Sequence, residues 1–217
     1  MKLYGISGLG ADKRVFKSLT LDCEIIPLEW ITPMRNESLE NYSSRLSRLI
    51  NTDEEFGIIG VSFGGLVATE ISKLLNPKIT ILISSAETFK ELRFVYRLVG
   101  KLKLIQFIPS ALFNLPRTLA LWVFGTKNKL LIDILDDTDL NFAKWAIQKL
   151  ISWKNENTVL NPILKISGEK DKLIPPNVDE NTTVIPDGQH FMIIDKAKEI
   201  SEIINYSIRK TNRQHRI

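Results

Sequence analysis

The sequence predicts an α/β fold, in which a mostly parallel, doubly wound sheet of about six strands carries a helical insertion. Two observations predict it. Short apolar runs rich in Ile, Val and Leu alternate with helical segments at both ends of the chain, which is typical of strands buried on both faces and of the helices that connect them. Between Ala86 and Asn161 the strand signal disappears, and the sequence indicates several amphipathic helices instead.

The elements follow in chain order. The expected strands are Leu3–Ser7, Cys23–Pro27, Phe56–Val61, Ile79–Ser84, Ile163–Ser167 and Thr183–Ile185. The expected helices are Lys13–Leu19, Ser38–Asn51, Phe63–Leu75 and Asp195–Arg209. Asp12 stands where it would cap the first helix, and Asn76-Pro77 would end the third. In the insertion we expect breaks near Pro109, Pro116 and Gly125. The core therefore comprises residues 1–86 and 159–217, and residues 87–158 form a helical lid.

Composition narrows the class of protein. The chain has 217 residues, of which 44% are hydrophobic and 25% charged, as in a globular domain. Cys23 is the only cysteine, which excludes an intramolecular disulfide and a cysteine-based zinc site. No cofactor or metal is expected. No 18-residue stretch is free of charge, so we expect no spanning helix. The first ten residues lack the apolar run of a signal peptide, which together with the single thiol favours the cytoplasm.

The formal net charge of +4 is spread unevenly. Between Thr88 and Leu131 only Glu91 is acidic, against eight basic residues: Lys90, Arg93, Arg97, Lys101, Lys103, Arg117, Lys127 and Lys129. No nucleic-acid reading motif accompanies them, so a nucleic-acid partner is not expected. Three interpretations stay open: attraction of an anionic substrate, weak association with an anionic membrane surface, or simple solvation of the outer face of the lid.

The segment Phe56–Ala68 carries the pattern G-x-S-x-G as Gly60, Ser62 and Gly64, directly after an apolar strand and directly before a helix. A serine at such a strand-to-helix turn lies in strained backbone, and small neighbours let the strand and the helix approach each other. This context predicts a nucleophile. The alternative is a glycine-rich turn that only connects elements or holds a phosphate, but a P-loop would need lysine where Leu66 follows Gly65.

A serine needs a base, and the chain has only two histidines, His190 and His215. His190 lies in a glycine-containing loop after the last strand, whereas His215 lies in a basic tail. We therefore expect His190 to be the base, the alternative being a loop histidine with no role in catalysis.

The histidine in turn needs a carboxylate to hold its tautomer. Asp171 follows the preceding strand and is the preferred candidate, with Glu169 and Glu87 as rivals. Asp187 is expected to be a turn residue. Two backbone N–H groups must bind the oxyanion, and we assign them to Phe63 and to Leu9 in the loop after the first strand.

These residues resemble the α/β-hydrolase superfamily, whose members carry nucleophile, acid and histidine in this chain order. The shared features are the first loop at Ser7–Gly10, the turn at Gly60–Gly64, G-x-x-D-x-x-x-P at Gly168–Pro175, and G-x-H-F at Gly188–Phe191. The resemblance implies a triad of Ser62, Asp171 and His190 and a lid between the fourth and fifth strands. Two departures are expected: Ser7 stands where many members have histidine, and the family's N-terminal strand pair is missing.

The function that this pattern favours is hydrolysis of a small ester, thioester or related acyl substrate through an acyl-enzyme on Ser62. Substrate contacts are expected from Gly8 and from two lid residues, Trp122 and Trp145, for which packing within the lid is the other interpretation. Carbon–carbon bond hydrolysis or lyase chemistry remains an alternative because it also uses serine and histidine. A second alternative is a ligand-binding or signalling protein that keeps the triad as a pocket.

Overall fold

The computed structural model describes residues 1–102, 108, 109 and 116–214. Six parallel strands form a single sheet in the order β2-β1-β3-β4-β5-β6, which confirms the predicted sheet. The strands are β1 (Lys2–Ile6), β2 (Ile25–Leu28), β3 (Phe56–Val61), β4 (Thr80–Ile83), β5 (Ile163–Gly168) and β6 (Thr182–Ile185).

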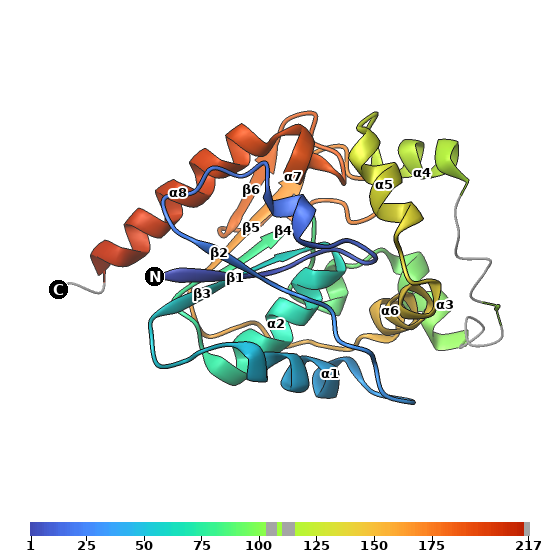
Figure 1. Cartoon of the computed structure of the whole chain (residues 1–217), viewed down its shortest axis with the longest axis horizontal. Helices are drawn as coiled ribbons and strands as arrows, with labels where there is room; N and C mark the ends of the chain where they lie inside the picture. The colour runs from blue at the N-terminus through green and yellow to red at the C-terminus, as the bar shows by residue number, and fades with distance from the viewer. Residues whose placement is uncertain (103–107, 110–115, 215–217) are drawn as a thin grey trace.

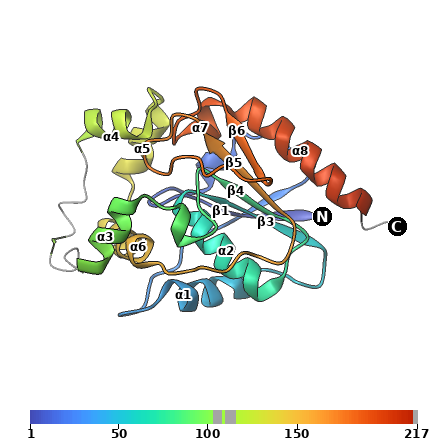
Figure 2. The same cartoon turned by 180° about the vertical axis from the view of Figure 1, so that it is seen from behind.

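Helices cover both faces of this sheet (Figures 1 and 2). On one face α1 (Leu39–Leu46) and α2 (Phe63–Leu75) build a core around Tyr42, Leu66 and Ile71. On the other face α8 (Ala197–Gln214) packs with the short elements η1 (Lys13–Phe16) and α7 (Met192–Asp195). Burial on both faces explains why the central strands β3 and β4 contain no exposed position.

The predicted helices are correct in place and partly wrong in length. The third, α2, has the predicted bounds and ends at Asn76 in left-handed backbone. The first is only a 3-10 turn, although Asp12 caps it as predicted by accepting from the Arg14 N–H at 2.8 Å. The second ends at Leu46 and continues as the 3-10 turn η2 (Ser47–Leu49), where the Ser47 hydroxyl donates to the Ser44 carbonyl. The fourth begins later than expected, at Ala197, and runs to Gln214.

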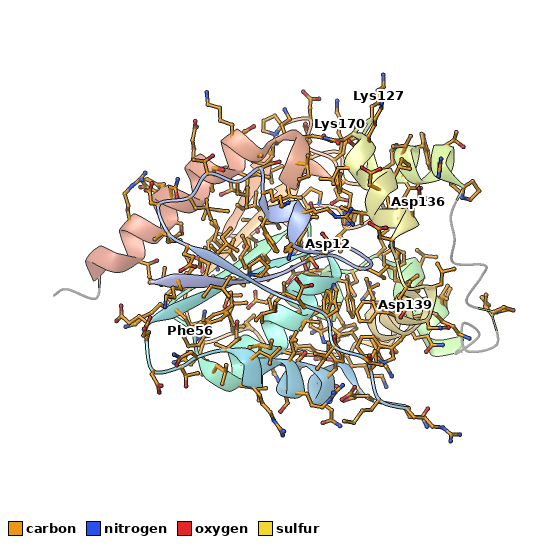
Figure 3. The ribbon with its side chains drawn as sticks, viewed as in Figure 1. Asp12, Phe56, Lys127, Asp136, Asp139 and Lys170 are labelled. Carbon is orange, nitrogen blue, oxygen red and sulfur yellow. The ribbon has the colours of Figure 1, made fainter. Side chains whose placement is uncertain are left out.

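Between β4 and β5 the described residues form helices and no strand: η3 (Phe89–Glu91), α3 (Phe94–Leu102), α4 (Arg117–Phe124), α5 (Lys129–Asp136) and α6 (Leu140–Ser152). Pro116 begins α4 and Gly125 ends it in left-handed backbone, as the sequence predicts. Asp139, labelled in Figure 3, caps α6 by accepting from the Asn141 N–H at 2.8 Å. Both cartoon views place α3–α6 at the end of the molecule opposite the two termini (Figures 1 and 2).

A buried ion cluster fastens the start of this helical insertion to the sheet. Lys165 on β5 is 3% exposed and is hydrogen-bonded to Asp179, with Glu91 at 3.4 Å and Glu87 at 3.9 Å. Burial alone would lower the pKa of Lys165, but the hydrogen bond to Asp179 and the other carboxylates raise that pKa above its ordinary value. The cluster therefore depends on the Lys165 charge.

No helix in the described part of the chain is long and apolar enough to cross a membrane.

Candidate active site

Ser62 occupies a strained turn between β3 and α2. Its backbone has φ 52° and ψ −123°, a region that non-glycine residues rarely adopt. Three hydrogen bonds hold it there: its N–H donates to the Ile83 carbonyl at 2.9 Å, and its own carbonyl accepts from the Ser85 hydroxyl at 2.7 Å and the Gly65 N–H at 2.9 Å. The surrounding structure therefore fixes the direction in which the Ser62 side chain leaves the turn.

The two flanking glycines allow this turn because no side chain would fit at either. A Cβ at Gly60 would lie 2.5 Å from the Gly65 Cα, and a Cβ at Gly64 would lie 2.1 Å from the Ser7 carbonyl oxygen. The second contact joins the start of α2 to the end of β1. It thus brings Ser62 beside the loop that follows β1.

Ser62, His190 and Asp171 form a continuous chain of hydrogen bonds. His190 Nε2 lies 2.9 Å from Ser62 Oγ, and His190 Nδ1 lies 2.8 Å from Asp171 Oδ2. His190 is 5% exposed and Asp171 is 4% exposed. The second oxygen of Asp171 accepts from the backbone N–H groups of Leu173 and Ile174, at 2.8 and 2.9 Å. The carboxylate is therefore held in one orientation, and it in turn orients the imidazole ring.

The loops that carry the last two residues are bonded to each other. The Lys170 N–H donates to the Gly188 carbonyl at 2.8 Å, and the Glu169 N–H donates to the Ile185 carbonyl at 3.1 Å. Because β5 and β6 are parallel neighbours, both loops leave the same edge of the sheet. This adjacency brings Asp171 and His190, which are 19 positions apart in the sequence, within hydrogen-bond distance.

The other carboxylates that the sequence offers have different partners. Glu169 is exposed and accepts from the Asp187 N–H. Glu87 is buried, accepts from the Val159 N–H at 2.8 Å, and belongs to the ion cluster around Lys165. Asp187 has φ 55° and pairs with Lys170, as a turn residue would. None of the three contacts His190, and His215 lies outside the described residues.

The loop after β1 (residues 7–11, here the first loop) is tightly closed. The Ala11 N–H donates to the Gly8 carbonyl, and the Ala11 carbonyl accepts from the Ser7 hydroxyl at 2.7 Å and from Trp30 Nε1 at 3.0 Å. The Ser7 side chain is thus used inside the loop. A Cβ at Gly8 would lie 3.6 Å from Ser62 Cβ, so the loop lies directly against the serine.

The two expected oxyanion donors are available for a ligand. Leu9 N–H donates to no acceptor among the described residues. Phe63 is the first residue of α2, where an N–H has no acceptor within its own helix. Both residues line the same cavity as Ser62. The arrangement can therefore offer two N–H groups to negative charge that develops next to Ser62 Oγ.

The cavity over Ser62 has a volume of about 310 Å³ and is lined by Gly8, as the sequence predicts, and by side chains of the helical insertion. The two predicted tryptophan contacts are not part of this lining. Trp145 packs on Tyr42 and Phe63 in an aromatic cluster, with ring centroids 4.6 and 6.0 Å apart. Trp122 is 63% exposed, and its ring lies under the ammonium group of Lys172 at 4.1 Å.

Two residues of the insertion contact the site and carry no signal in the sequence. The Phe124 ring meets the His190 ring edge-on at 5.4 Å, and the Phe124 carbonyl accepts from the Phe191 N–H at 3.2 Å. The Thr138 hydroxyl lies 3.1 Å from the Gly10 carbonyl oxygen and 2.8 Å from the Ile134 carbonyl oxygen. Phe124 is far in sequence from His190, and Thr138 is far from Gly10, so no local pattern marks either contact.

The described residues contain no group of three His, Cys, Asp or Glu side chains that could hold a metal ion. What they bring together is a hydroxyl, an imidazole and a carboxylate in series, beside two free N–H groups. This set can activate a serine and stabilise an oxyanion.

Comparisons with known proteins find likeness at the level of structure alone. No family model matches the chain, and no curated protein matches its sequence. MenH from S. aureus is similar with a TM-score of 0.71 at 17% identity, covering 98% of this chain and 94% of that one.

Two further solved structures are similar to the same degree. For a thermophilic esterase from Thermogutta terrifontis the TM-score is 0.72 at 16% identity, covering 97% of this chain and 90% of that one. YbtT, a type II thioesterase from the yersiniabactin pathway, has a TM-score of 0.68 at 16% identity, covering 97% and 93%. Identities this low show a shared fold.

Proposed function

We propose that this chain, which has the α/β-hydrolase fold, is a serine hydrolase that cleaves a small ester, thioester or related acyl substrate. One observation carries the proposal: the hydrogen bonds that run from Asp171 through His190 to Ser62 Oγ, at the floor of a cavity. A serine that only connected β3 to α2 would not need a buried histidine and carboxylate in series.

The geometry gives each group a role in acyl transfer. Ser62 Oγ attacks the carbonyl carbon while His190 Nε2, at 2.9 Å, takes the serine proton. Asp171 stabilises the imidazolium that forms. The N–H groups of Leu9 and Phe63 bind the tetrahedral oxyanion, each contributing roughly 3–4 kcal/mol to the barrier reduction.

The second half of the reaction reuses the same groups. His190 gives the proton to the leaving alkoxide or thiolate, which departs and leaves an acyl group on Ser62. Water then attacks the acyl carbonyl, with His190 as base, and releases the acid. Residues 87–158 act in this scheme as the lid over the reacting atoms, on a core made of residues 1–86 and 159–217.

The comparisons support acyl chemistry in general terms. The similar solved structures include thermophilic esterases and a type II thioesterase. Oxygen esters and thioesters share the carbonyl chemistry above and differ in the leaving group, so both belong to the proposal.

Labelling with a fluorophosphonate probe tests the nucleophile. The wild-type chain should be labelled, and Ser62→Ala should lose all labelling because the reacting oxygen is gone. His190→Ala should also lose it, whereas His215→Ala is the matched control and should keep it. Undiminished labelling of Ser62→Ala would refute the assignment.

Turnover of p-nitrophenyl esters separates the proposal from its alternatives. Hydrolysis that Ser62→Ala abolishes supports the hydrolase. Labelling of Ser62 without turnover of any ester or thioester would favour carbon–carbon bond hydrolysis, lyase chemistry or a ligand-binding protein.

A further inference from the structure

The side chains that the structure describes around the cavity above Ser62 carry no formal charge. Among the described residues that line it there is no Asp, Glu, Lys or Arg. The described lining is aliphatic and aromatic apart from Gly8 and four side chains with polar atoms: Ser62, Tyr96, Thr138 and His190. A charged group entering such a space would lose its hydration without gaining a counter-ion.

Most of these polar groups are already engaged. Ser62 and His190 bond to each other, and Thr138 lies against two backbone carbonyls. The Tyr96 hydroxyl has no hydrogen-bond partner among the described residues. Burial raises the pKa of Tyr96, so the phenol stays neutral. Among the described lining residues it is the one polar side chain left to meet a polar atom of a substrate, beside the backbone N–H groups of Leu9 and Phe63.

The described basic side chains of the insertion do not line this cavity. Arg117 pairs with Asp136 at 2.8 Å, and Lys90 lies 3.5 Å from Glu156. Lys127 points away from the molecule in Figure 3. Wherever the structure describes its side chains, the positive charge of this segment is thus kept off the cavity wall, and it gives the cavity no means of holding an anion.

One wall of the cavity is a continuous apolar stripe on α6. It consists of Leu140, Ala143, Ile147, Leu150 and Ile151, which recur at helical spacing and share one face. At 1.5 Å per residue the stripe is about 16 Å long. Helix α3, which bears Tyr96, lies beside α6 in both cartoon views (Figures 1 and 2).

We propose that the substrate of Ser62 carries an uncharged hydrocarbon acyl chain of medium length, bound along this stripe of α6. The inference rests on the proposed function and deepens it by naming the substrate class. The methyl end of the chain points away from Ser62, and the ester carbonyl sits between Ser62 Oγ and the N–H groups of Leu9 and Phe63.

A chain-length series tests the length. With p-nitrophenyl acetate, butanoate and octanoate, kcat/KM should rise about fourfold for each methylene added, because each buries further apolar surface. A profile that is flat, or highest for acetate, would overturn the proposal.

A matched charged substrate tests the absence of charge. The p-nitrophenyl monoester of suberic acid has the same chain length as the octanoate but ends in a carboxylate. Its kcat/KM should be at least about 100-fold lower, because the buried carboxylate finds no counter-ion. Equal rates would overturn the proposal.

Neighbouring positions on α6 offer a variant and its control. Ile147→Phe should fill part of the stripe and lower the octanoate-to-acetate ratio of kcat/KM about tenfold. Gln148, the next residue, does not line the cavity, so Gln148→Phe should leave the ratio unchanged. If the two variants have equal octanoate-to-acetate ratios, the acyl chain does not bind along the stripe of α6.

Binding separates this inference from the proposed function. In the Ser62→Ala chain, calorimetry should show methyl octanoate binding at least tenfold more tightly than the methyl monoester of suberic acid. If fluorophosphonate does not label Ser62 but this difference is found, the proposed function fails and the acyl-chain site stands. If labelling succeeds and the two esters bind equally, the acyl-chain site fails alone.

Discussion

Replacing Thr138 by valine removes one hydroxyl group from the contact between the helical insertion and the first loop. Gly10, in that loop, has φ 69°, and a Cβ there would lie 2.5 Å from the Thr138 Oγ1. The Thr138 side chain therefore packs directly on the backbone of the loop that carries Leu9 N–H. Valine keeps the volume of threonine and loses only its donor, so the Gly10 carbonyl, at 3.1 Å, loses its share of a hydroxyl that also lies 2.8 Å from the Ile134 carbonyl.

Two free energies set the limits of the expected fall in kcat for Thr138→Val. A typical intramolecular hydrogen bond contributes about 0.5–1.5 kcal/mol, and loss of a whole oxyanion donor costs roughly 3–4 kcal/mol. The Leu9 donor stays present in Thr138→Val, and the bonds from Ser7 and Trp30 still close the loop. The smaller figure therefore applies, and kcat should fall about three- to tenfold.

Steady-state kinetics on p-nitrophenyl acetate measures this effect, because the short acyl group makes little use of the apolar cavity. KM should stay within about twofold, because the hydrogen bond from Leu9 N–H to the substrate oxygen strengthens only in the transition state. Thr138→Ser keeps the hydroxyl and should retain most of kcat. If Thr138→Val loses stability in urea yet keeps full kcat, the side chain supports the fold without positioning the first loop.

Two further predictions concern stability. Lys165→Met should lower the free energy of unfolding by about 3 kcal/mol in urea titrations at neutral pH, because it leaves Glu87 and its neighbouring carboxylates without a cation; a loss below about 1 kcal/mol would contradict a charge-dependent cluster. Arg45 donates to Glu37 at 2.7 Å and holds the pKa of that buried carboxyl below its ordinary value, so this contribution is complete above pH 5 and is lost as pH falls through the lowered pKa. Arg45→Gln should cost about 2 kcal/mol at pH 7 and flatten the decline in stability on acidification, and an unchanged acid profile would contradict the assignment.

The sequence was sufficient for the sheet because buried parallel strands have a simple signature. β3 and α2 have the predicted bounds, since an apolar run, a glycine turn and a helix end at Asn76 are all local features. The prediction of a helix over Lys13–Leu19 is wrong. The structure has a 3-10 turn of four residues there, because a segment this short with a good cap does not sustain an α-helix. Local preference indicated the element and could not determine its length.

In the candidate site, the residues placed by strand topology are predictable from the sequence, and those placed by helix packing are not. Ser62, Asp171 and His190 lie at the carboxyl ends of parallel strands, so topology alone brings their loops together, and the structure shows them in contact. The sequence leaves two interpretations for Trp122 and Trp145, packing within the insertion or contact with the substrate. Their positions depend on how helices pack on one another, and in the structure Lys172 and Tyr42 are their partners.

The basic segment shows why net charge misleads about a binding site. A count over Thr88–Leu131 adds up every side chain of a segment, but a helix on a cavity has two faces with different surroundings. Helix α5 turns Leu131, Ile134 and Leu135 toward Ser62, while Asp136 on the same helix pairs outward with Arg117. The charge therefore describes what meets solvent, and the apolar spacing describes what meets the substrate. For an insertion built of amphipathic helices, the proposed substrate follows from the apolar stripe that lines the cavity and not from the net charge of the segment.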